Sequence, residues 1–152
     1  MSNIFSKILR LSTLLSTSGF IGAILIQIYS RFFLPSAPAW TEEASRFFFV
    51  YAISFAAGLA MKDGEYVCFD VIYNRMNSKN KRAIDILNSG LITVLFLILG
   101  ISALQYVELG LMERSPGLTV SMSFAFASLL ILSSTVGVYA FLDTMKNYKQ
   151  GK

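Results

Sequence analysis

The sequence predicts an all-α integral membrane protein, because its composition is strongly apolar and its few charges leave long uncharged stretches between them. Of the 152 residues, 55% are hydrophobic and only 14% are charged. A soluble domain usually has about 25% charged residues. We therefore expect lipid, and not water, to surround most of this chain.

Four transmembrane helices account for the uncharged stretches, which are 11–30, 47–61, 86–107 and 115–142. A helix needs about 20 mostly apolar residues to cross a bilayer. We place the helices at about 8–33, 42–62, 84–107 and 119–143, in one membrane domain of residues 1–152. The stretches lack the polar and apolar alternation of a β-barrel. The first is too long for a signal peptide and lacks a small-residue cleavage site, so we expect a mature helix.

The basic residues predict the orientation, since cytoplasmic segments of membrane proteins carry an excess of Lys and Arg. Only Arg31, Arg46 and Arg114 of the 13 basic residues lie outside the two termini and the connection between helices two and three. Both termini should therefore be cytoplasmic, with 34–41 and 108–118 in the periplasm. The same rule explains the net charge of +4, so no nucleic-acid partner is expected.

Residues that usually carry chemistry are scarce. The chain has no histidine and one cysteine, Cys68, which excludes histidine-held haem, a disulfide pair and the usual His or Cys metal sites. We expect no cofactor and no enzymatic activity. Charged residues are also missing from the bilayer centre, where they would mark an ion path. The amides of Gln27 and Gln105 are expected to form hydrogen bonds between helices.

A stripe of small and polar residues predicts a packing face on the first helix. Its members recur at helical spacing and are Ser12, Ser16, Gly19, Ala23 and Gln27. Small residues let helices approach closely in a membrane. Four helices cannot bury every apolar face, so the remaining surface should meet lipid or a larger membrane partner.

The second helix should begin with a charged group. Thr41 is a candidate N-cap, Glu42 and Glu43 follow in the first turn, and Arg46 is spaced to pair with either acid. With Trp40 at the membrane interface, this group is either a simple helix start or a contact site for a partner.

The second helix should end at Gly64 in a left-handed conformation. Beyond it, Phe69, Ile72, Tyr73 and Met76 repeat at helical spacing. This pattern predicts a short amphipathic helix over about 66–77 that lies along the membrane surface.

Together these residues resemble the small membrane (Q) subunit of tripartite ATP-independent periplasmic, or TRAP, transporters. The similarity covers nearly the whole chain. The most specific positions are Trp40, Glu42, Glu43, Ser45, Arg46, Gly64, Glu65, Val67 and Asp70, and the pair Ser115-Pro116 before the fourth helix also fits. Tyr66 differs, because members often have histidine there.

The resemblance implies a subunit of the bacterial inner membrane that does not transport by itself. In the family a periplasmic protein binds the solute, commonly an organic acid, and a large membrane subunit moves it with sodium in an elevator-like domain. The small subunit would pack against the fixed scaffold of the large one. The residues implied as partner contacts are Trp40, Glu42, Glu43, Arg46, Glu65 and Asp70.

Two other functions remain open from the residues alone. The chain could form a small homo-oligomeric channel or exporter, which would show transport activity without a larger subunit. It could also be a membrane assembly factor or a lipid-facing structural protein, which would not copurify with a large permease.

Overall fold

Four long helices make up the computed structural model, which describes residues 3–36, 38–64 and 77–149. They are α1 (Asn3–Phe33), α2 (Ala39–Asp63), α4 (Ser78–Met112) and α5 (Ser123–Lys149). All four are long and apolar enough to cross a membrane. In the described ranges the only strand-like pairing is an isolated bridge between Arg114 and Ser121. The all-α membrane fold predicted from the sequence is confirmed.

The helices extend past the predicted spans, since α1 begins at Asn3 and α5 ends at Lys149, and the largest difference is in α4. This helix runs through Glu108 to Met112, beyond the predicted end at residue 107, while α5 begins only at Ser123. A single charge does not interrupt the backbone hydrogen bonds of a helix, so α4 continues past it. Residues 113–122 form a compact turn, which delays the start of α5.

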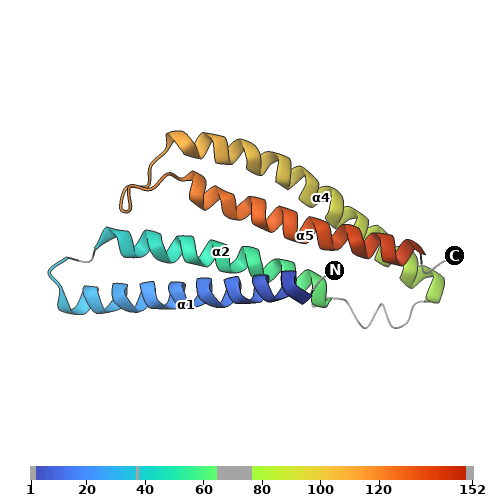
Figure 1. Cartoon of the computed structure of the whole chain (residues 1–152), viewed down its shortest axis with the longest axis horizontal. Coiled ribbons are helices and arrows are strands. Elements are labelled where there is room, and N and C mark those ends of the chain that lie inside the picture. The colour runs from blue at the N-terminus through green and yellow to red at the C-terminus, as the bar shows by residue number, and fades with distance from the viewer. Residues whose placement is uncertain (1–2, 37, 65–76, 150–152) are drawn as a thin grey trace.

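The helices lie in one layer in the order α1, α2, α5, α4 (Figure 1). They form two antiparallel hairpins, α1–α2 and α4–α5, which meet where α2 runs beside α5 in the same direction. In the most apolar stretches of the outer helices α1 and α4, only 6% of residues are buried, against 28% in α2 and α5. The inner helices therefore hold the layer together, and the outer helices present apolar side chains outward.

The seam between α2 and α5 is built from small residues. A Cβ added to the buried Gly58 of α2 would lie 2.8 Å from Cβ of Thr135 on α5. Beside this contact, Met61, Val136 and Ala140 form a small buried cluster. The buried hydroxyls of Ser54 and Thr135 donate to carbonyls of their own helices, at 2.7 Å in each case. The two helices therefore approach each other closely here without leaving the hydroxyl of Ser54 or Thr135 unpaired.

The predicted packing stripe of α1 occupies positions of low exposure. Ala23 is buried, and Ser12, Ser16, Gly19 and Gln27 are half-buried. A Cβ on Gly19 would lie 2.8 Å from the ring of Phe48, so α2 approaches α1 closely at that point. That this stripe governs assembly stays a prediction.

The predicted end of α2 at Gly64 is confirmed. Gly64 has φ 71°, in the left-handed region, and its N–H donates to the carbonyl of Ala60. The predicted interfacial helix over 66–77 lies outside the described residues, apart from Asn77 at its end. Glu65 and Asp70 lie outside them as well.

Replacing Gly58 with alanine should destabilise the seam. The added methyl group would overlap Thr135, and overpacking a close contact costs about 1–3 kcal/mol. Gly22→Ala is the matched control, because nothing lies within 4 Å of a Cβ there, and both variants gain the same intrinsic helix preference of alanine. We expect the thermal unfolding midpoint in detergent to fall for Gly58→Ala and not for Gly22→Ala. Equal midpoints would show that α2 and α5 do not meet at Gly58.

Candidate functional site

The first turn of α2 contains the charged group singled out in the sequence. The helix begins at Ala39 directly after Pro38, so the prediction that Thr41 is the N-cap is wrong. Proline fixes φ near the helical value and lacks an N–H, which suits the start of a helix. Thr41 instead lies inside the helix, buried, and its hydroxyl donates to the carbonyl oxygen of Pro38 at 2.8 Å.

Glu42 and Arg46 form an exposed ion pair one turn apart. Nη2 of Arg46 lies 2.5 Å from Oε1 of Glu42, and both side chains remain more than half exposed. Ser45, next to them, donates to the backbone carbonyl of Glu42 at 2.7 Å. Exposed pairs of this kind contribute about 0–1 kcal/mol, so this pair does little for the fold. Trp40, just before it, is 43% exposed.

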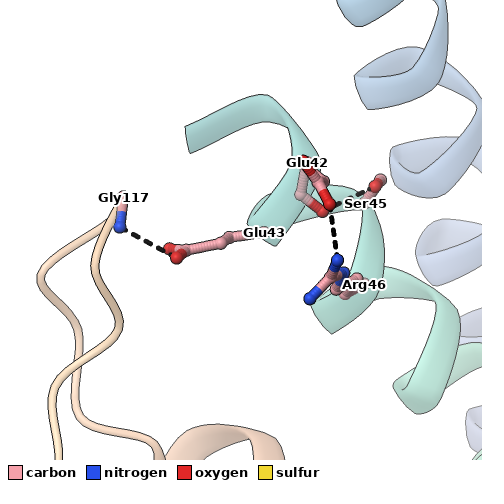
Figure 2. A network of polar contacts seen from close by, with 5 residues as sticks. All are labelled: Glu42, Glu43, Ser45, Arg46 and Gly117. Atoms are coloured by element: carbon pink, nitrogen blue, oxygen red, sulfur yellow. Dashed lines mark hydrogen bonds and ion pairs between the residues drawn. The ribbon is translucent and has the colours of Figure 1, made fainter. Parts of the chain in front are cut away.

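Glu43 points away from that pair, toward the turn between α4 and α5 (Figure 2). Its carboxylate accepts hydrogen bonds from the backbone N–H of Gly117 at 2.8 Å and of Leu118 at 2.7 Å. It also accepts one from the hydroxyl of Ser115. Glu43 was one of the residues implied as partner contacts, and the structure shows that its carboxylate is already engaged within the chain.

The turn that Glu43 contacts has its own set of hydrogen bonds. The N–H of Ser115 donates to Val120 at 2.8 Å, and the N–H of Thr119 donates to Ser115 at 2.9 Å. Thr119 has φ 56°, a conformation that side chains branched at Cβ rarely adopt. Ser121 donates to the carbonyl of Gly110 at 2.7 Å, which satisfies an unpaired carbonyl near the end of α4. The turn that presents these backbone amides to Glu43 is therefore also held by hydrogen bonds of its own.

Gly117 is required by the closeness of this contact. A Cβ at this position would lie 3.0 Å from the carbonyl carbon and oxygen of Ala39 and from the carboxyl carbon of Glu43. Ser115 and Pro116 were singled out in the sequence, whereas Gly117 was missed. The run Ser-Pro-Gly is itself a turn signal, but nothing local indicates which distant side chain the turn contacts.

A second hydrogen bond between the two hairpins lies farther along the seam, where the Tyr51 hydroxyl of α2 donates to the carbonyl of Phe124 of α5 at 2.7 Å. Between this bond and Glu43 lies a small pocket of about 240 Å³. Its lining is mostly apolar and consists of Glu43, Arg46, Phe47, Val50, Ser115, Pro116, Met122 and Ala125.

The hydrogen bonds of Glu43 with Ser115, Gly117 and Leu118, which we call the clamp, attach the first turn of α2 to the turn between α4 and α5. A carboxylate faces two backbone amides and a hydroxyl, which suit a charge-assisted hydrogen-bond network. Within residues 3–36, 38–64 and 77–149, no three His, Cys, Asp or Glu side chains gather where a metal ion could bind. The site joins one hairpin to the other and leaves Trp40, Glu42 and Arg46 on the surface.

Comparison with known proteins agrees with this architecture. Residues 20–149 match the family model of the tripartite ATP-independent periplasmic transporters, DctQ component. A Haemophilus influenzae protein named "Putative TRAP transporter small permease protein" is 25% identical over 144 residues, which cover 95% of this chain and 87% of that protein. The chain therefore belongs to the DctQ component family of TRAP transporters.

Proposed function

We propose that this chain is the scaffold subunit of a TRAP transporter and packs against the fixed part of a large permease subunit. That subunit would import an organic acid, coupled to sodium, from a periplasmic binding protein in the bacterial inner membrane. The observation that carries the proposal is the single layer of helices, whose outer members α1 and α4 bury only 6% of their most apolar stretches. Such a layer supplies surface for a larger membrane protein and encloses no path of its own.

The exposed apolar side chains support the same interpretation. They lie along most of the length of both outer helices, from Ile4 to Phe33 on α1 and from Ile84 to Met112 on α4. Large continuous apolar surfaces mark contact with a membrane or with another protein. A subunit that widens a scaffold needs both contacts, one for lipid and one for the permease.

The clamp end of the molecule would face the periplasm. There the exposed group of Trp40, Glu42 and Arg46 is available to the large subunit or to the binding protein, while Glu43 holds the adjacent turn in place. We therefore propose Trp40, Glu42 and Arg46 as the direct partner contacts. Glu43 is instead proposed as the residue that positions the turn beside them.

The proposed orientation can be tested by cysteine labelling. In a background without Cys68, Ser36→Cys should react with an impermeant thiol reagent added from the periplasm, and Ser78→Cys should react only after the membrane is opened. The reason is the excess of basic residues at the termini and in the connection after α2. Labelling of Ser78→Cys in intact cells would invert the orientation.

The proposed function can be tested by assembly and uptake. A tagged form of this chain, expressed with the large permease and binding protein of the proposed transporter, should copurify with the permease. Uptake should require all three proteins. Transport by this chain alone would instead support a homo-oligomeric channel, and failure to recover any large subunit would contradict the scaffold role.

The contact group can be tested in the same assay with Glu42→Gln. Because the Glu42–Arg46 pair is exposed, the variant should insert and fold normally. Uptake should fall several-fold, because we propose that this pair contacts a partner. Asp63→Asn is the matched control, since Asp63 pairs with Lys62 at the opposite end of α2 at 3.8 Å. Equal uptake by both variants would leave the Glu42 pair without a role in docking.

A further inference from the structure

We infer that the small pocket between the clamp and the Tyr51 hydrogen bond binds one acyl chain of a membrane phospholipid whose phosphate contacts Arg46. The headgroup that fits this site carries an ammonium group, as in phosphatidylethanolamine. This inference goes beyond the proposed function, because it concerns a lipid that this chain holds by itself, without the permease.

The pocket lies at one end of α2 and α5, two helices that are long and apolar enough to cross a membrane. On α2 its lining runs from Glu43 to Val50, which is about 10 Å along the helix at 1.5 Å per residue. On the other hairpin it runs from Ser115 in the turn to Ala125 in the first turn of α5. The clamp aligns the first ends of these two runs, and the hydrogen bond from Tyr51 aligns their second ends.

The lining changes from polar to apolar along this length. Glu43, Arg46 and Ser115 lie toward the turn, whereas Val50 and Ala125 lie toward the middle of the helices. A phospholipid in a membrane crossed by α2 and α5 has the same order, with its headgroup outside and its chains inside. Apolar cavities do not hold water well and bind apolar groups instead. The pocket therefore matches a lipid chain in its chemistry and in its direction.

The volume of the pocket limits what it can hold. About 240 Å³ is smaller than the pockets of about 300–1,000 Å³ that enclose drug-sized ligands. We therefore expect one acyl chain inside, with the second chain and the headgroup on the surface of the protein. The larger groove between α4 and α5, of about 490 Å³, has no charged residue in its lining, so nothing there selects a headgroup.

Arg46 can supply the contact to the phosphate. Its side chain is 74% exposed, and its ion pair with Glu42 uses the Nη2 atom. In the part of the chain that the structure describes, no other hydrogen bond engages this guanidinium. A guanidinium has five N–H donors and binds phosphate oxygens through two of them at once. Arg46 therefore retains enough donors to hold a phosphate while it stays paired with Glu42.

The acids beside Arg46 select the headgroup. Glu42 and Glu43 carry two negative charges against the one positive charge of Arg46, so they repel a headgroup with a net negative charge. A phosphate that has its own ammonium group is neutral overall. The ammonium can pair with Glu42, which is 53% exposed, because the clamp already engages Glu43.

A phospholipid matches the pocket better than a side chain of a protein partner does. The site offers an apolar cavity, a base and an acid, in one direction along the helices. No single amino acid side chain combines an apolar chain with both an anion and an amine, whereas a zwitterionic phospholipid does. Charge complementarity therefore favours the lipid as the occupant.

Native mass spectrometry of the full-length chain in a mild detergent tests this inference. The lipids compared are phosphatidylethanolamine, phosphatidylglycerol and a diacylglycerol with the same acyl chains. We expect one phosphatidylethanolamine molecule to be retained, phosphatidylglycerol to be retained less, and diacylglycerol to be lost because it lacks the phosphate. Equal retention of diacylglycerol would contradict the contact with Arg46, and equal retention of phosphatidylglycerol would contradict the selection by the acids.

Matched variants separate a built site from general adhesion of lipid. Arg46→Gln should lower retention about tenfold, as expected when hydrogen bonds to a charged group are lost. Arg31→Gln, at an exposed arginine in the last turn of α1, should change it by less than about twofold. Val50→Phe should fill the pocket and lower retention, whereas Val94→Phe, at a 56% exposed position of α4, should not. With thermal unfolding midpoints showing that all four variants fold, equal retention within either pair would overturn the inference.

A photoreactive amino acid in place of Met122, in the pocket wall, tests the occupant in the cell membrane. We expect a phospholipid adduct that decreases when Val50→Phe is added. An adduct with a larger protein instead would show that a partner's side chain occupies the pocket, and would overturn the inference. Because lipid retention is measured on this chain alone, its failure is distinguishable from a failure of the proposed assembly with the permease.

Discussion

The contact between Glu43 and the turn at Ser115–Leu118 is the polar interaction on which the arrangement of the two hairpins depends. Between helices in a bilayer there is no hydrophobic force, because lipid chains are as apolar as the side chains they replace. The hairpins must therefore be joined by close packing and by hydrogen bonds. Gly58 and Thr135 supply the packing, and Glu43 fixes the end of the seam with two backbone amides and a hydroxyl.

That seam explains why the molecule is a layer, and the layer is the basis of our proposal that the chain supports a larger membrane protein. Because α2 contacts both α1 and α5, each outer helix is attached along one side only. Most of the surface of α1 and α4 is left apolar and uncovered. The DctQ family is one component of a transporter, so we propose that part of this surface contacts another subunit.

The fold could be predicted from the sequence because the spans are set by local composition. Runs such as 86–107 have no other stable solution in lipid than a helix, and Gly64 ends α2 through its own conformational freedom. The site was predicted less well. Thr41 was assigned a capping role that Pro38 made unnecessary. The partner of Glu43 lies at Gly117, and a contact so distant along the chain depends on the order of the helices, which no local pattern encodes.

The most direct test of this account is a double-mutant cycle between Glu43 and Ser115, read out as the free energy of unfolding in reversible detergent denaturation. Glu43→Ala should destabilise the protein more than Glu42→Ala, whose side chain lies in the exposed pair. Ser115→Ala should cost much less in the Glu43→Ala background than in the wild type, because its hydroxyl has already lost its acceptor. Additive effects of the two substitutions would show that the clamp does not join the hairpins.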